Sequence, residues 1–468
     1  MDFLGADRLL PVSRASLGVA RSLYQSVAEL PIISPHGHTD PEWFAKDTAF
    51  PDPATLFVIP DHYITRMLIS QGVTPQELGL APRGAADPGP DPRSIWRSLA
   101  QHYHLFRATP SRMWLEYAFH NLFGLEERLT PDNADHQFDH ITECLKSPQF
   151  RPRALFDRFR LEVLSTTDSA LDRLQAHRQI ADSAWPGRVI PTYRPDIVTD
   201  PETPGFADNV ERFCALAGEP VGSWEGYLNA HRIRRAVFSG VGATATDHGH
   251  PTARTENLPA SEAAALFEKA LSGTCTASEA EAFRGQMLTE MARMSIEDGL
   301  VMQLHPGSRR NHSPAMFHQF GPNVGFDIPG RVDFVGGLKP LLDAVGLDSR
   351  LTLILFTLDE STYARELAPL AGAYPAVRLG PAWWFHDSPE GMRRYREMTT
   401  ETAGFYNTVG FNDDTRGFCS IPARHDMSRR VDCAYLADLV VSGRLDEAEA
   451  AELAYELAYG LAKRAYRL

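Results

Sequence analysis

The sequence predicts an α/β fold, a (β/α)₈ TIM-type barrel with a helical insertion after its first strand. Three observations lead to this prediction. Short apolar runs recur along the chain, segments with helical periodicity separate them, and the residues that follow the runs are rich in histidine, aspartate and arginine. Strands of a closed parallel sheet are covered on both faces and therefore read as apolar runs. Barrel enzymes carry their active sites at the carboxyl ends of these strands.

Eight apolar runs end abruptly in polar residues and are the predicted barrel strands. In chain order they are 31–33, 161–164, 188–190, 236–238, 300–304, 351–356, 377–379 and 408–411. Helical periodicity is clear between several of them, as in 266–298 and 389–406. This alternation is the pattern of consecutive βα units.

A long segment separates the first two predicted strands. It is mainly helical in pattern, with aromatic-rich stretches at 95–106 and 113–123 and a Pro/Gly-rich break at 82–92. A single βα connection is much shorter, so we interpret the segment as an insertion on the rim of the barrel. We expect three parts: 1–40 with an N-terminal helix and the first barrel strand, 41–160 as a helical insertion subdomain, and 161–468 with the rest of the barrel and C-terminal helices.

The composition excludes several classes of partner. The 468 residues are 43% hydrophobic and 23% charged, typical of a globular protein, and the net charge is -14. A field of this sign repels nucleic acid and acidic membrane surfaces, so an anionic substrate would have to be captured by a few local arginines.

Cysteine usage and the lack of targeting segments predict a cytoplasmic protein. The five cysteines are scattered singly without a CxxC pair, which favours reduced thiols. No basic region followed by an apolar core opens the chain, and no apolar run is long enough to span a bilayer.

A histidine pair follows the first predicted strand. In His36-Gly37-His38, alternate residues of an extended segment point to the same side, so both imidazoles can face one metal ion. Strands one and eight are neighbours in a closed barrel, and Asp414 follows the eighth, where it would complete a His₂Asp site. Isolated HxH pairs are more often surface histidines, and Asp413-Asp414 would more often be a solvated turn or helix cap.

Several motifs in order resemble one family. They are Ser34-Pro35-His36-Gly37-His38-Thr39-Asp40-Pro41, Asp61-His62-Tyr63, Thr192-Tyr193-Arg194-Pro195-Asp196, Met302-Gln303-Leu304-His305, Trp383-Trp384-Phe385 and Asp414-Thr415-Arg416. Together they resemble uronate isomerase, the glucuronate isomerase branch of the amidohydrolase superfamily. The resemblance extends to Arg424-His425 and Arg429-Arg430 near the end of the chain.

The resemblance implies a barrel of the metal-dependent hydrolase kind that interconverts D-glucuronate with D-fructuronate and D-galacturonate with D-tagaturonate. It implies one divalent metal, commonly Zn²⁺, on His36, His38 and Asp414. It also implies catalytic roles for Asp414, Tyr63, His62 and Arg416, and substrate contacts for Arg194, Asp247, His305, Trp383 and Arg416. Thr415, Gly417 and Tyr193 depart from the family pattern, and we expect these changes to affect packing more than chemistry.

The chemistry of these residues agrees with such a reaction. Moving one proton from C2 to C1 and another between two oxygens requires a base, an acid and a stabiliser of negative charge. Each residue also has a plain interpretation: Tyr63 as a core or rim aromatic, His62 as a cap, Arg194 in an ion pair with Asp196, Asp247 in a polar turn, and His305 as a buried, hydrogen-bonded histidine. Of Trp383-Trp384, we expect one ring to line the pocket and the other to pack behind it.

Two alternatives stay open at this point. One is a one-metal hydrolase, deaminase or decarboxylase acting on a small anion; a two-metal hydrolase is disfavoured because 239–247 lacks a bridging lysine and 357–360 lacks a histidine. The other is a non-catalytic binding protein. Two histidines and a carboxylate suit Mn, Fe or Co as well as Zn, and a homo-oligomer is expected because helical insertions often provide interfaces.

Overall fold

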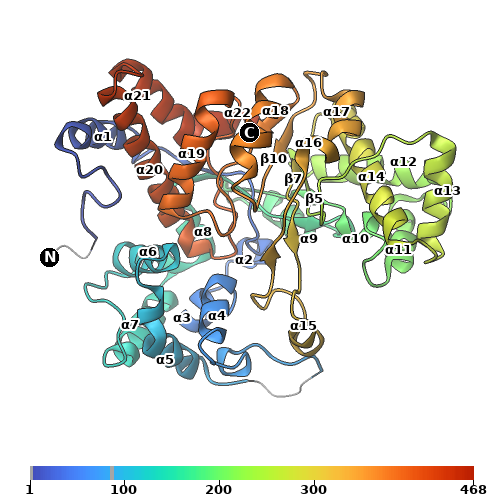
Figure 1. The fold of residues 1–468 in the computed structure, drawn as a ribbon. Helices are drawn as coiled ribbons and strands as arrows, with labels where there is room; N and C mark the ends of the chain where they lie inside the picture. Colours follow the sequence, from blue (N-terminus) through green and yellow to red (C-terminus); the bar gives the residue numbers. More distant parts are fainter. Residues whose placement is uncertain (1–3, 85–88) are drawn as a thin grey trace.

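A computed structural model describes residues 4–84 and 89–468 (Figure 1). Parallel strands form its centre, and short apolar segments such as Val301–Leu304 are completely buried there. The central strands are β1 (Ile32–Ser34), β2 (Leu161–Ser165), β3 (Asp168–Ser169), β4 (Arg188–Ile190), β5 (Tyr193–Arg194), β6 (Ala245–His248), β7 (Val301–Leu304), β10 (Leu353–Leu355) and β11 (Val377–Leu379).

The strands follow one another in barrel order. One sheet has the order β1-β2-β4 and the other β11-β10-β7-β6-β5-β3, and all their pairings are parallel. The sheets are continuous with each other, because the Thr166 and Asp168 amides donate to the Ile190 and Thr192 carbonyls between the short strands. β2 and β3 together therefore occupy one strand position of the barrel. β4 and β5 together occupy the next.

The eighth predicted strand is less regular than the others. Thr408 forms an isolated parallel bridge with Leu379, and the Val409 amide donates to the Leu379 carbonyl. At the other side, the His38 amide donates to the Thr415 carbonyl over 3.0 Å. Within residues 4–84 and 89–468, this bond rather than a strand ladder joins the last segment to the first, and it brings His38 next to Asp414.

The fourth predicted strand, 236–238, is wrong. These residues end helix α12 (Trp224–Ser239), whose buried face includes Phe238, and the strand at this position is β6. Three apolar residues in a row fit the buried face of a helix as well as a strand. The true strand was missed because its residues include Asp247 and His248, which are polar although fully buried.

Only helices and loops occur between β1 and β2 in the described part of the chain. They lie below the barrel at the left of Figure 1. Asp40, Asp52, Asp61 and Asp91 cap four of them by accepting backbone amides of the first turn. The helices are α2 (Pro41–Lys46), α3 (Pro53–Phe57), α4 (His62–Ile69), α5 (Pro92–His102), α6 (Pro110–Tyr117), α7 (Ala134–Lys146) and α8 (Pro152–Arg158).

The other helices lie around the barrel, except α15, which belongs to a hairpin described below. The predicted segment 266–298 is two helices, α13 and α14, while 389–406 contains α19. These helices are α1 (Arg14–Val27), α9 (Gln175–Ala181), α10 (Asp196–Thr199), α11 (Phe206–Ala217), α12 (Trp224–Ser239), α13 (Ala260–Leu271), α14 (Ala277–Asp298), α15 (Pro314–Phe320), α16 (Phe334–Gly337), α17 (Lys339–Val345), α18 (Ala368–Ala373), α19 (Pro389–Ala403), α20 (Ile421–Val441), α21 (Glu447–Tyr455) and α22 (Leu461–Ala465).

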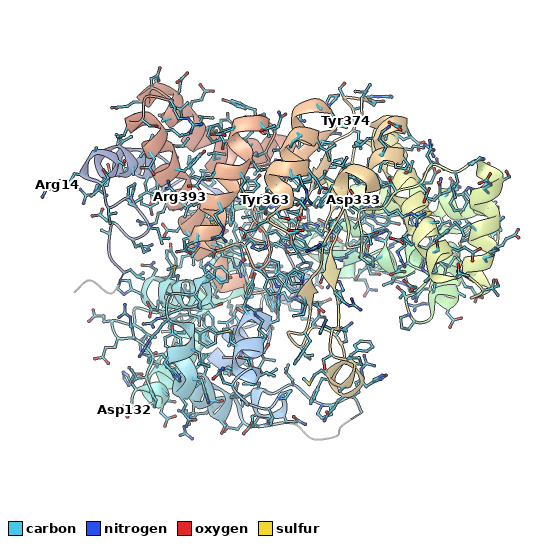
Figure 2. All side chains as sticks on the ribbon, in the orientation of Figure 1. Arg14, Asp132, Asp333, Tyr363, Tyr374 and Arg393 are labelled. Atoms are coloured by element: carbon cyan, nitrogen blue, oxygen red, sulfur yellow. The ribbon has the colours of Figure 1, made fainter. Side chains whose placement is uncertain are left out.

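A small antiparallel hairpin extends from the barrel after β7. It consists of β8 (Ser308–Arg309) and β9 (Ile328–Pro329), with α15 between them, and Figure 1 shows α15 below the barrel at the level of the insertion helices. Side chains fill the interior, where Tyr363 is buried, whereas Arg14 and Asp132 project into solvent (Figure 2). No helix of the described residues is long and apolar enough to cross a membrane.

Candidate active site

A cavity of about 280 Å³ opens at the carboxyl ends of the barrel strands. Of the residues predicted from the sequence, only Asp247 does not line it, and Asp247 contacts two residues that do. The predicted residues in the lining are His36, His38, His62, Tyr63, Arg194, His305, Trp383, Asp414 and Arg416. The barrel therefore brings together residues from the beginning, the middle and the end of the chain.

Two imidazoles and one carboxylate converge at one side of the cavity. The Nε2 atoms of His36 and His38 lie 3.5 and 3.1 Å from Oδ1 of Asp414. That buried oxygen accepts no hydrogen bond from the described residues. Asp414 has a φ of 37°, a left-handed conformation that aspartate tolerates better than most residues. An unsatisfied carboxylate oxygen facing two imidazole nitrogens fits a divalent metal ion.

The charge states of these groups suit metal binding. Burial lowers the pKa of His36 to about 4, which keeps its imidazole neutral. Burial would raise the pKa of Asp414, but the His36 and His38 imidazoles hold that pKa below its usual range. A neutral imidazole and an ionised carboxylate are the forms that bind metals. In contrast to the solvated turn considered above, neighbouring Asp413 is buried, and its Oδ2 lies 3.0 Å from Nε2 of His425.

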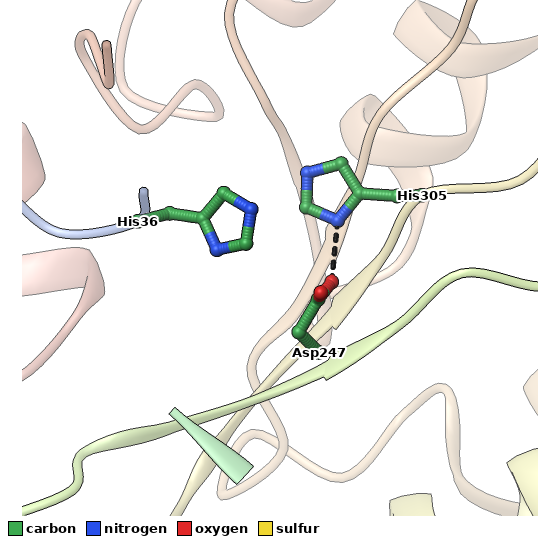
Figure 3. A group of neighbouring side chains, drawn as sticks. All are labelled: His36, Asp247 and His305. Atoms are coloured by element: carbon green, nitrogen blue, oxygen red, sulfur yellow. Dashed lines mark hydrogen bonds and ion pairs between the residues drawn. The ribbon is translucent and has the colours of Figure 1, made fainter. Parts of the chain in front are cut away.

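His305 lies against this group (Figure 3). Its ring stacks on that of His36 with centroids 4.6 Å apart, and its Nδ1 is 2.6 Å from Oδ1 of Asp247. Burial would raise the pKa of Asp247, but Arg194 and His305 hold it well below its usual range. Potential ligand atoms of His36, Asp247 and His305 also lie within 4.8 Å of one another. The buried Nε2 of His305 has no hydrogen-bond partner among the described residues.

Arg194 is held by two carboxylates. Its Nε donates to Asp196 Oδ2 over 2.8 Å, and its Nη1 lies 2.9 Å from Asp247 Oδ2. The ion pair with Asp196 considered from the sequence is thus present, although Arg194 also lines the cavity. Gly249 makes room for this arrangement, because a Cβ at this position would lie 1.9 Å from Nη2 of Arg194.

Arg416 and Arg310 are less completely neutralised. Arg416 donates to Oδ1 of Asn323 over 3.0 Å and has no carboxylate within 4 Å in residues 4–84 and 89–468. Arg310, on the hairpin after β7, lies 3.4 Å from Asp327. Burial and the charge of Arg310 lower the pKa of Arg416. Sequence reasoning missed Arg310, although Arg309-Arg310 follows His305 within a few residues.

In another part of the lining, Tyr63 belongs to a hydrogen-bonded chain. Its hydroxyl donates to Asp387 Oδ1 over 2.7 Å and accepts the amide of Phe385 over 2.8 Å. Nη1 of Arg424 donates to the other oxygen of Asp387 over 2.7 Å. Sequence reasoning missed Asp387, although it closely follows Trp383-Trp384-Phe385, and gave no role to Arg424.

Aromatic residues shape the rest of the cavity. Trp383 packs edge-on to His305 with centroids 4.6 Å apart, and Trp384 packs edge-on to His62 at 5.0 Å. The expectation that only one tryptophan lines the pocket is wrong: both do. They lie in an irregular segment after β11 rather than in a strand, so adjacent side chains need not point to opposite sides. Burial, with a further effect of Arg416, lowers the pKa of His62 to about 3, so its ring is neutral.

Comparison with known proteins identifies the family of this chain. The family described as glucuronate isomerase matches residues 6–466. A uronate isomerase of Rhizobium meliloti is 61% identical over 462 residues, which span 99% of this chain and 98% of the relative. One of Brucella canis is 60% identical, covering 99% of this chain and all of the relative.

Solved structures give the same result. The crystal structure of glucuronate isomerase from Caulobacter crescentus has a TM-score of 0.98 and 54% identity, covering 100% of this chain and 98% of that one. A uronate isomerase from Thermotoga maritima has a TM-score of 0.92 at 27% identity, with full coverage of both chains. The predicted fold class and resemblance are confirmed, and the chain belongs to the glucuronate isomerase family.

Proposed function

We propose that this protein is an aldose–ketose isomerase that interconverts D-glucuronate with D-fructuronate and D-galacturonate with D-tagaturonate. The observation that carries the proposal is the end-to-end match to proteins named uronate isomerase at about 60% identity. The cavity offers what the reaction needs: bases and acids, cationic groups for a carboxylate, and a His₂Asp set. The family match also disfavours the hydrolase, deaminase and decarboxylase alternative.

One divalent metal ion is part of the proposal. His36, His38 and Asp414 would hold it, and Zn, Mn, Fe and Co all suit such a donor set. When bound, the ion would polarise a substrate oxygen and stabilise negative charge as it develops.

We propose that the guanidinium groups bind the substrate carboxylate, with Arg416 as the main anchor. Arg194 already faces Asp196 and Asp247, whereas Arg416 contacts, among the described residues, only the amide oxygen of Asn323. A substrate carboxylate would supply the counter-charge that Arg416 lacks, through paired N–H donors. Arg194 and Arg310 would add to the positive potential and orient the same end of the sugar.

Proton transfer is proposed to involve both walls of the cavity. Asp414, ionised beside the histidines, would take the proton from C2 and return it to C1, while Tyr63 would move a proton between the two oxygens. The Asp247 contact favours the proton of His305 on Nδ1, so its Nε2 would accept a hydrogen bond from a substrate hydroxyl. Neutral His62 and the edge of Trp383 would position the sugar.

The experiment is incubation with D-glucuronate in D₂O, followed by NMR. We expect the ketose to form, with deuterium at C1 to the extent that the transferred proton exchanges with solvent. D-Galacturonate serves as the second substrate and D-glucose, without a carboxylate, as the control. If neither hexuronate is consumed by protein shown to contain one metal ion per chain, the proposal is wrong.

We also propose a cytoplasmic location and a homo-oligomer. The five cysteines form no disulfide, as expected in a reducing compartment. The molar mass in solution, measured by light scattering, tests the oligomer: a value near 52.0 kDa, the mass of one chain, would contradict it.

A further inference from the structure

Three side chains from distant parts of the chain form one wall of the cavity. Tyr63 lies on the first turn of α4, Asp387 on the segment after β11, and Arg424 on α20. Asp387 and Arg424 line the cavity together with Tyr63 and are also strongly buried. One oxygen of the Asp387 carboxylate accepts the tyrosine hydroxyl, and the other accepts Arg424. The carboxylate is thus fixed between a proton donor and a permanent cation.

We propose that Asp387, held by Arg424, is the positioning residue that accepts the phenolic proton of Tyr63 while Tyr63 takes a proton from a substrate hydroxyl. This inference rests on the proposed isomerase function. The O–H bonds of the substrate and of Tyr63 break, and new O–H bonds form on Tyr63 and on Asp387. Asp387 becomes a neutral acid, and the negative charge moves to the substrate oxygen. The reverse transfers deliver a proton to the neighbouring sugar oxygen and restore both residues.

The surroundings of Tyr63 favour this coupled transfer over a free phenolate. Burial and the adjacent Asp387 carboxylate raise the pKa of Tyr63 well above its usual value. The phenol therefore gives up its proton readily only if it gains another at the same time. Since its oxygen also accepts the Phe385 amide, the hydroxyl hydrogen is directed at Asp387.

Arg424 keeps the carboxylate in place. Its guanidinium lies 3.5 Å over the ring of Trp114, its Nε donates to Ser420 Oγ, and its Nη1 also reaches the Asp413 carbonyl over 3.4 Å. The last contact joins the Tyr63 wall to the segment that carries Asp414. Because the planar guanidinium group of Arg424 is held by several contacts, it keeps the Asp387 carboxylate in the position from which that carboxylate accepts the Tyr63 hydroxyl.

The test compares Asp387→Asn with wild-type protein. Asparagine keeps the size and can accept the hydrogen bond, but it takes no proton. We expect kcat to fall about 100-fold, the lower range for loss of proton-transfer assistance. KM should change less than about threefold, because Asp387 is not proposed to bind substrate. The metal content should stay at the wild-type value.

Asp432→Asn is the matched control. Asp432 forms an equally buried pair with Arg396, at 2.7 Å between α19 and α20, and neither residue lines the cavity. The Asp432→Asn variant measures the loss of stability from breaking a buried Asp–Arg pair alone. We therefore expect a lower melting temperature and a kcat within about threefold of wild type. If Asp387→Asn behaves in the same way, Asp387 is only structural and the inference is overturned.

A double variant gives an independent measurement. If Asp387 acts through Tyr63, adding Asp387→Asn to Tyr63→Phe should lower kcat by less than about threefold further. Independent losses that multiply would overturn the inference. If Asp387→Asn does not fold, Arg424→Lys replaces it, and the same fall in kcat at unchanged KM is expected. Tyr63→Phe with full kcat would also overturn the inference, whereas wild-type protein inactive on both hexuronates would instead contradict the proposed function.

Discussion

The two walls of the cavity differ in how completely their polar atoms are satisfied. On the Tyr63 wall, the tyrosine hydroxyl and both oxygens of Asp387 have hydrogen-bond partners. On the wall formed by His36, His305 and Asp414, buried atoms such as Oδ1 of Asp414 and Nε2 of His305 have none among the described residues. Buried polar atoms are rarely left unbonded in folded proteins. The incomplete wall is therefore the one where we expect a ligand to bind, whereas the polar atoms of the complete wall already have partners within the protein.

The largest expected effect is that of His36→Asn on the incomplete wall. Loss of a ligand should remove the bound metal and lower kcat/KM about 1000-fold, because metal stabilisation of developing charge contributes several kcal/mol. Metal analysis and turnover of D-glucuronate measure both effects.

His136→Asn, at an exposed histidine on α7, is the control and should retain metal and activity. Retention of one metal ion per chain by His36→Asn at full activity would show that the two walls do not differ in the way described.

A smaller effect is expected for Arg416→Met. A hydrogen-bonded charge contact contributes about 1.5–3 kcal/mol, so the KM for D-glucuronate should rise about 10- to 100-fold with a small change in kcat. Arg14→Met, at an exposed arginine, is the control. Steady-state kinetics measure the effect, and an unchanged KM would remove Arg416 as the carboxylate anchor.

The smallest expected effect concerns Asp168, a buried carboxylate that pairs with no arginine in the part of the chain that the structure describes. Its Oδ2 accepts the Thr166 hydroxyl, and burial raises the pKa of Asp168 to about 7. The folded state then binds the proton more tightly than the unfolded state, so this group makes the protein less stable as the pH rises from about 4 to 7. The loss should be about 1 kcal/mol per pH unit between pH 5 and 6.

Asp168→Asn should lack this loss. The measurement is the free energy of unfolding at pH 5, 5.5 and 6 for both proteins. His177 lies next to Thr166, and burial lowers the pKa of His177 to about 4, which acts in the opposite direction in both proteins. Parallel pH dependences of wild type and variant would contradict the prediction.

The sequence predicted the parts of the fold that depend on hydrophobic pattern. Strand segments such as 188–190 and 377–379 agree with β4 and β11 because each has two buried apolar residues in a short run. The pattern failed at β6, where polar residues form a buried strand and one of them, Asp247, contacts His305 and Arg194 of the cavity. A rule that finds strands by apolarity is least reliable where strands carry function.

The residues of the candidate site could likewise be predicted only in part. Residues that come directly after a strand, such as His36 and His305, could be predicted because the barrel gathers strand ends. Arg310 and Asp387 could not, since the first lies on a hairpin and the second in an irregular segment. Their positions depend on loop conformation, which has no simple sequence period.

The His₂Asp set joins the first and last strand positions of the barrel, and this has a consequence for biosynthesis. His36 and His38 leave the ribosome early, but Asp414 is made only when most of the 468 residues have been translated. A nascent or prematurely terminated chain would therefore lack the third of the proposed metal ligands. Tight binding of a metal ion would require the polypeptide to be synthesised at least as far as Asp414. The protein would therefore acquire its metal late in biosynthesis.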